Sequence, residues 1–141
     1  MDRLGQRLSV AAQALETLRE LSGLEAPSRV ERDAAIQRFK NSWETVWKAA
    51  RLFLRTYEGV EVGSPKASVR AARDAGLLSR DHAEAALAMA DDRNLTVHIY
   101  NEALAKEIFR RLAGHARLMG TWMDGMTKRV AAPKRSDRPD C

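Results

Sequence analysis

Apolar residues recur every three or four positions along most of the chain, a spacing typical of amphipathic α-helices. The widest apolar stripe lies between residues 28 and 58 and contains Ile36, Phe39, Trp43, Val46, Trp47, Ala50, Phe53, Leu54 and Tyr57. Narrower stripes contain Leu4, Leu8, Ala11, Leu15 and Leu18 near the start, and Leu104, Ile108, Leu112, His115, Met119, Trp122 and Met126 near the end. No segment sustains the alternation of apolar and polar residues that a half-buried strand shows. The pattern therefore predicts an all-α fold.

Capping residues predict where the helices begin and end. The sequence SRVE (28–31) is a capping box, in which Ser28 accepts an amide proton and Glu31 reaches back to the start of the helix. Ser64 followed by Pro65 is typical of a helix start, and glycines commonly follow helix ends. The predicted helices span about residues 2–22, 28–58, 65–76, 79–92 and 101–126. Joined by short loops, they would form an antiparallel four- to five-helix up-and-down bundle, with residues 1–126 as one domain.

Five of the eight aromatic residues lie in the predicted helix over residues 28–58, namely Phe39, Trp43, Trp47, Phe53 and Tyr57. A stripe this wide could stack nucleic-acid bases. Aromatic residues at helical spacing are more often part of a core or a dimer interface. We therefore expect these side chains to be packed rather than to bind a ligand.

The net charge of +5 is concentrated at the end of the chain. Residues 127–141 contribute +3, which leaves the helical domain nearly balanced at +2. We expect these residues to form a basic, disordered tail, which either attracts nucleic acid non-specifically or keeps the protein soluble; the second role is favoured.

The cysteine content and the apolar runs indicate the compartment. The only cysteine, Cys141, is the last residue, so no internal disulfide can form. The longest apolar run, AALAMA (85–90), is far shorter than the roughly 20 residues of a membrane span, and the first residues lack the apolar region of a signal peptide. We expect a cytoplasmic protein.

The stretch DDRNLTVHIY (91–100) interrupts the apolar pattern with polar residues and is the candidate for chemistry. Its Arg-x4-His spacing, Arg93 to His98, recurs at Arg110 and His115, so spacing alone decides nothing. His115 lies on an apolar stripe and is expected to be a hydrogen-bonded core residue. His98 lies at a helix boundary among polar residues, as a water-accessible site requires. The chain has no zinc-ligand pattern and no phosphate-binding glycine loop, and we expect neither a metal nor a cofactor.

The geometry of this stretch allows two interpretations. If Asn101 caps the next helix, residues 97–100 are extended and His98 and Tyr100 share a face. If the helix is unbroken, Arg93 and Tyr100 share a face instead, and Arg93 and His98 lie about 140° apart. A purely structural alternative pairs Arg93 with Asp91, Asp92 or a neighbouring helix and leaves His98 on the surface.

Three segments together resemble a known family: RDAAIQRFKNSWETVWKAARLFL, GSPKASVRAARDAGLL and MADDRNLTVHIYNEALAKEIFRRL. They are similar to the HEPN superfamily, in particular to HepT-like toxins and nucleotidyltransferase substrate-binding proteins. The most specific part is R-N-x3-H-x-Y, here Arg93, Asn94, His98 and Tyr100. The resemblance implies a helical bundle that dimerises and brings Arg93 and His98 of both copies into one cleft, with both residues accessible to solvent and Tyr100 at the rim.

In function, the resemblance implies a metal-independent endoribonuclease that acts as the toxin of a toxin–antitoxin pair. Arg93 and His98 would be catalytic, and Asn94 and Asp92 supporting. The partner would be a minimal nucleotidyltransferase, the antitoxin, which can adenylylate Tyr100 and so inactivate the toxin. One alternative is a non-catalytic accessory subunit that positions the substrate of a nucleotidyltransferase. A plain helical dimer or scaffold is the other.

Overall fold

Residues 2–132 are described by the computed structural model, and within this range all regular structure is helical. The main helices are α1 (Arg3–Ser22), α2 (Arg29–Phe53), α3 (Pro65–Asp74), α4 (Arg80–Leu95) and α5 (Glu102–Ala131). A π-helical turn, η1 (Leu54–Glu58), continues α2, and a 3₁₀ turn, η2 (Thr96–His98), continues α4. The all-α prediction is confirmed, whereas dimerisation stays a prediction.

Each main helix begins with a side chain that accepts a hydrogen bond from a backbone amide in the first turn. The five capping residues are Asp2, Ser28, Ser64, Ser79 and Asn101. At α2 both halves of the predicted capping box form: the Ser28 amide donates to Glu31 at 2.8 Å, and the Glu31 amide donates to Ser28 Oγ at 3.1 Å. A cap of this kind stabilises a helix by about 1 kcal/mol. Local sequence therefore fixes where the helices start.

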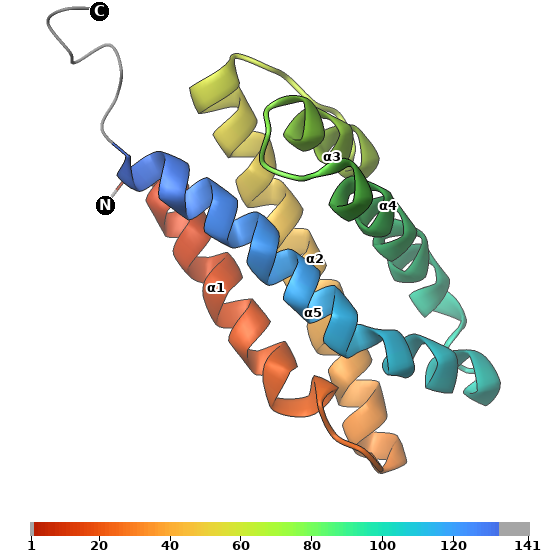
Figure 1. Cartoon of the computed structure of the whole chain (residues 1–141). Helices are drawn as coiled ribbons and strands as arrows, with labels where there is room; N and C mark the ends of the chain where they lie inside the picture. The colour runs from red at the N-terminus through yellow and green to blue at the C-terminus, as the bar shows by residue number, and fades with distance from the viewer. Residues whose placement is uncertain (1, 133–141) are drawn as a thin grey trace, which may run out of the picture.

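The three long helices α1, α2 and α5 pack side by side, and α3 and α4 lie against α2 and α5 (Figure 1). The start of α1 and the end of α5 lie at the same end of the bundle, because the two helices run antiparallel (Figure 1). The largest fully buried side chains come from all three long helices and from α4: Leu18, Ile36, Phe39, Trp43, Phe53, Met89, Ile108, Leu112, Met119, Trp122 and Met126. The three predicted apolar stripes thus meet in one core.

The aromatic residues of α2 belong to that core, as predicted. Trp43 packs against Trp122 of α5 with ring centroids 6.3 Å apart, and Phe53 stacks on Tyr57 at 4.8 Å. No helix within residues 2–132 has an apolar stretch long enough to cross a membrane.

The predicted ends of two helices are wrong. Helix α4 continues to Leu95 rather than ending at Asp92. Of the two interpretations of the next residues, the extended one is not seen: Asn101 caps α5, but residues 96–98 form a 3₁₀ turn. The Asp92 carboxylate is bound by side chains of α5, so it is compatible with a position inside α4.

Helix α5 likewise continues past Met126 to Ala131. Its last turns are held by Arg129, which contacts Glu58 at 2.7 Å and lies over the Phe53 ring, and by Val130, which packs against the core. The first part of the predicted disordered tail is therefore helical, and residues 133–141 lie outside the described residues.

Candidate functional site

The candidate site lies where α4 tightens into η2 and the chain turns toward α5. Thr96 organises this turn: it is buried, its hydroxyl donates to the Arg93 carbonyl at 2.6 Å, and its amide donates to the same oxygen. Asn101 then caps α5 through Leu104. Short polar contacts at both ends therefore hold residues 93–101 in one conformation.

Arg93 is half-buried, and no carboxylate lies within ion-pair distance of it among residues 2–132. Its Nη1 donates to Thr96 Oγ1 at 3.4 Å, and its Nε is buried without a partner in the described part of the chain. The alternative that pairs Arg93 with Asp91 or Asp92 is wrong, because Asp91 binds Lys66 at 2.6 Å and Asp92 binds Arg111. A partly desolvated guanidinium without an anion is suited to bind a phosphate.

His98 is exposed, and its Nδ1 lies 3.3 Å from the hydroxyl of Tyr100. The two rings meet edge to face with centroids 5.8 Å apart. Tyr100 is 82 % exposed, the largest value among the exposed large hydrophobic residues that the structure describes. The contact uses Nδ1, and Nε2 of His98 makes no hydrogen bond within the described residues. The structure thus brings His98 and Tyr100 together.

Arg93 and His98, in contrast, are not joined by a hydrogen bond within the described residues. Residues five apart on an α-helix lie about 140° apart around its axis, and the tighter 3₁₀ turn widens this separation. The two side chains of one copy therefore leave the helix in different directions, and Asn94 lies between them on the exposed surface.

Asp92, predicted as a supporting residue, is the centre of a network that the sequence did not reveal. It is 7 % exposed, accepts two hydrogen bonds from Arg111 at 2.8 and 2.9 Å, and lies 2.7 Å from Nε2 of His115. His115 also stacks on the buried Phe39 ring at 5.3 Å, so it is hydrogen-bonded as predicted but lies half-buried at the edge of the core. Arg111 and His115 are four residues apart on α5, and this pair of donors on one helix face was the available signal.

The charge state of Asp92 follows from these partners. Burial raises its pKa, but the hydrogen bonds from Arg111 and His115 and their positive charge outweigh burial, so the pKa lies below its ordinary value. The pKa of Arg111 is raised, chiefly by its hydrogen bonds to Asp92. Asp92 is therefore ionised and holds α4 against α5. It affects the position of the adjacent Arg93 only through the backbone of α4.

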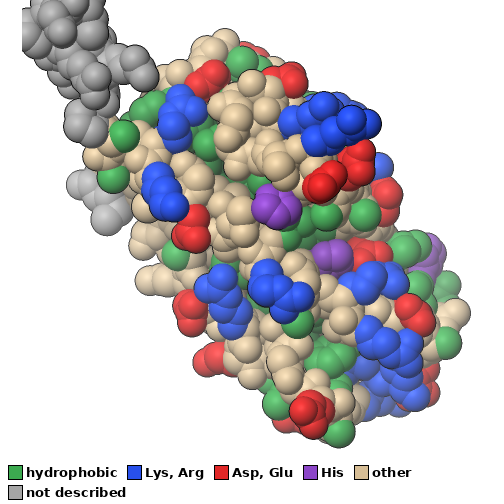
Figure 2. Space-filling view, viewed as in Figure 1, with side chains coloured by type: hydrophobic (Ala, Val, Ile, Leu, Met, Phe, Trp, Pro, Cys, Tyr) green, Lys and Arg blue, Asp and Glu red, His purple; other side chains and the backbone are tan. Residues whose placement is uncertain are grey.

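Apolar side chains surround the candidate site on the surface. Within the described residues, seven large hydrophobic side chains are exposed, and three of them, Leu95, Val97 and Tyr100, fall within six positions. Figure 2 shows Lys and Arg side chains gathered at the end of the molecule where α5 begins, with histidine nearby. An apolar patch beside cations is suited to contact another macromolecule.

The sequence over residues 6–128 matches the family described as nucleotidyltransferase substrate binding protein like. The chain belongs to this family. No curated protein gives a significant match. One similar solved structure is a protein of Thermus thermophilus, which is 55 % identical, has a TM-score of 0.81, and is aligned over 82 % of this chain and 98 % of that one.

Two further solved structures of this fold belong to toxin–antitoxin complexes. One is a tri-AMPylated Shewanella oneidensis HEPN toxin in complex with an MNT antitoxin, with 14 % identity, a TM-score of 0.74 and coverage of 90 % of this chain and 98 % of that one. The other is a mutant of the MntA–HpeT toxin–antitoxin complex, with 14 % identity, a TM-score of 0.74 and coverage of 88 % and 96 %. At this identity they show the fold alone. The family member described here therefore has the HEPN fold, which confirms the resemblance found in the sequence.

Proposed function

We propose that this protein is the toxin subunit of a toxin–antitoxin pair and cleaves RNA without a metal ion. The observation that carries the proposal is that one helix corner holds both an exposed His98 and a half-buried Arg93 that has no carboxylate partner among residues 2–132. Membership of a nucleotidyltransferase-associated family and the fold of HEPN toxins support the proposal.

The chemistry follows from the two side chains. The 2′-hydroxyl of RNA attacks the adjacent phosphorus while His98 accepts its proton, and the 5′-oxygen of the next nucleotide leaves and takes up a proton. General acid–base catalysis by a histidine contributes about 10²–10⁴-fold. Arg93 binds the phosphate and the charge that develops on it.

A second copy of the chain completes the site in this proposal. The different directions of Arg93 and His98 within one copy favour a cleft to which two copies each contribute both residues. Leu95 and Val97 are exposed beside the site, and a dimer would remove them from water. The two-fold symmetry of such a dimer would place equivalent residues opposite each other.

The partner in this proposal is a minimal nucleotidyltransferase that modifies Tyr100. The tyrosine oxygen attacks the α-phosphorus of ATP, pyrophosphate leaves, and the phenolic proton is lost. The hydroxyl is accessible because Tyr100 is 82 % exposed, and it lies 3.3 Å from His98. An AMP group at this position would add bulk and negative charge where the RNA phosphate must bind, and so would block the toxin.

Cleavage of RNA by the purified chain tests the proposal. We expect His98→Ala and Arg93→Ala to lose at least about 100-fold in cleavage rate. His82→Ala is a matched control, because His82 is also exposed on α4 but lies at its far end. Equal cleavage by wild type and His98→Ala would refute the proposal. Mass analysis after coexpression with a minimal nucleotidyltransferase, the proposed partner, would show AMP on wild type and none on Tyr100→Phe.

A non-catalytic accessory subunit is the second candidate, and the family description itself favours it. In that case the complex with the nucleotidyltransferase would have an activity that neither chain has alone. Replacing His98 would then change neither cell growth nor assembly of the complex. The same His98→Ala protein therefore separates the two functions.

A further inference from the structure

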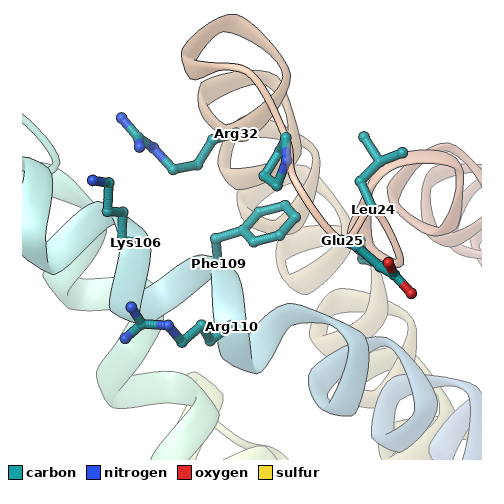
Figure 3. A pocket seen from close by; sticks show the side chains of 8 residues that line it. Leu24, Glu25, Arg32, Lys106, Phe109 and Arg110 are labelled. Atoms are coloured by element: carbon teal, nitrogen blue, oxygen red, sulfur yellow. The ribbon is translucent and has the colours of Figure 1, made fainter.

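A second cluster of cations lies at the junction of the α1–α2 loop with α5. The cavity there has a volume of about 360 Å³, within the range of small-ligand sites, and its lining includes Leu24, Arg32, Lys106, Phe109 and Arg110. Figure 3 shows Arg32 and Lys106 extending to the same side of the Phe109 ring, with Glu25 on the other side. The cavity thus has a cationic side, formed by Arg32 and Lys106, and an opposite side that carries Leu24 and the Glu25 carboxylate.

Arg32 is the unusual member of this cluster. It is only 6 % exposed, yet its side chain makes no hydrogen bond within the described residues, and its Nε is buried without a partner. The carboxylates of Asp33 and Glu102 lie within ion-pair distance of Arg32, at 3.9 and 3.7 Å, but both are too far away for hydrogen bonds. A buried guanidinium is costly unless its donors are satisfied, so this arrangement indicates an anionic ligand.

Lys106 lies beside Arg32, since its Nζ is 3.7 Å from the same Glu102 oxygen that Arg32 approaches. Glu102 is 62 % exposed and can turn toward water, whereas Arg32 cannot. Arg110 is already bound to Glu107 at 2.8 Å, so it contributes positive potential rather than free donors. Two cations with unused donors at one position match the oxygens of a phosphate group.

We propose that this cavity binds the phosphate group of a nucleotide through Arg32 and Lys106. The apolar part of the nucleotide would pack against Leu24 and Phe109. The phosphate can come from a free nucleotide or from an RNA strand that extends from the candidate site. The second source is within reach, because Lys106 lies only about 6 Å further along the α5 axis than Glu102, the first residue after the turn. Binding here is independent of RNA cleavage at His98.

Binding of two probes to the full chain tests this proposal. The first is 5′-AMP compared with adenosine, followed by NMR. The second is a 2′-O-methyl RNA oligonucleotide, which lacks the nucleophilic hydroxyl and so cannot be cleaved, followed by fluorescence anisotropy. The variants are Arg32→Gln and Lys106→Gln. Lys128→Gln is the control, since Lys128 is exposed on the same helix but lies outside the cavity.

We expect Arg32→Gln to weaken binding by about tenfold or more, and Lys106→Gln by roughly three- to tenfold, while Lys128→Gln binds like wild type. Loss of AMP binding, with adenosine inactive throughout, identifies a free nucleotide as the source. Loss of oligonucleotide binding without any AMP binding identifies the RNA backbone.

Equal affinity of wild type, Lys106→Gln and Lys128→Gln for both probes would overturn the proposal. Lys106 is half-exposed, so its variant folds even if Arg32→Gln does not. Because neither probe is cleaved, this result is separate from the test of RNA cleavage.

Discussion

Replacing Asp92 with Asn should destabilise the protein strongly, because one carboxylate joins α4 to two residues of α5. The substitution keeps the size and shape of the side chain but removes its charge. An amide has one oxygen, so it cannot accept both hydrogen bonds from Arg111 and the one from His115. The NH₂ group of Asn would also point at an N–H donor of Arg111 or His115, with which it cannot form a hydrogen bond.

The expected loss is about 2–3 kcal/mol. A hydrogen bond between charged groups contributes about 1.5–3 kcal/mol, and removing one partner of a fully buried pair costs about 3–5 kcal/mol. The expected loss is smaller than for a fully buried pair because the Arg111 side chain is 42 % exposed and keeps contact with water, although the side chains of Asp92 and His115 are only 10 % and 12 % exposed. For a chain of this size the loss corresponds to a fall in Tm of roughly 6–12 °C.

The difference between the two proteins should also depend on pH. The pKa of Asp92 is lower in the folded state than its ordinary value of about 4. A lowered pKa stabilises the folded state fully above the ordinary value, and the contribution is lost as the pH falls through the folded value. The Asn variant has no such titration at this position. The difference in unfolding free energy between wild type and Asp92→Asn should therefore have its full size at pH 7 and be smaller at pH 3.

Urea unfolding followed by circular dichroism at both pH values measures the gap. Asp91→Asn is the matched control, because Asp91 is the adjacent residue and its contact with Lys66 is exposed to water. That substitution should cost less than about 1 kcal/mol. Equal stability of wild type and Asp92→Asn at pH 7, or a gap that does not shrink at pH 3, would show that the network does not hold α4 to α5.

Three further predictions follow from exposed or strained positions. Val97→Glu should convert the proposed dimer into a monomer in light scattering at unchanged helix content, because Val97 is 63 % exposed in the single chain; a dimeric mass for both proteins would contradict an interface at Val97. Gly59→Ala should lower the unfolding free energy by about 1–2 kcal/mol, because Gly59 has a φ of 66° with open space around it, whereas Gly63→Ala in the same loop should be nearly neutral. Ser28→Ala should cost about 1 kcal/mol in thermal unfolding through loss of the capping box, and a stable variant would contradict this.

The helix starts and the core could be predicted from the sequence because both depend on local patterns. A capping residue acts on amides two or three positions away, and an apolar stripe depends only on helical spacing. Ser28 and Ser64 are therefore caps as predicted, and the stripe residues Phe39 and Trp43 are buried.

The wrong helix ends have long-range causes. Asp92 meets Arg111 and His115 across 19 and 23 positions of sequence, and Arg129 meets Glu58 across 71. The spacing of Arg111 and His115 places two donors on one face of α5, but it does not indicate that their partner is Asp92. Periodicity and capping therefore could not show that α4 and α5 extend further.

The candidate site was partly predictable for the same reason. The exposure of His98 and Tyr100 follows from polar neighbours at a helix boundary, which are visible in the sequence. The absence of a carboxylate near Arg93 among the described residues could not be predicted, because it results from Asp91 and Asp92 being bound to other helices. The burial of Arg32 was not predicted either. Arg32 directly follows the capping box in the sequence, and nothing in that pattern indicates that its side chain is buried.

Asp92 and Arg93 are neighbours with opposite surroundings, and this has a consequence for the direction of Arg93. Successive residues on a helix point about 100° apart, so a rotation of α4 about its own axis would move both side chains together. Two parallel hydrogen bonds to the planar Arg111 guanidinium resist such a rotation more than a single contact would. The direction in which Arg93 leaves α4 is therefore fixed by the contacts of Asp92 with α5. A partner that displaces α5 would change the direction of the Arg93 side chain without contacting Arg93.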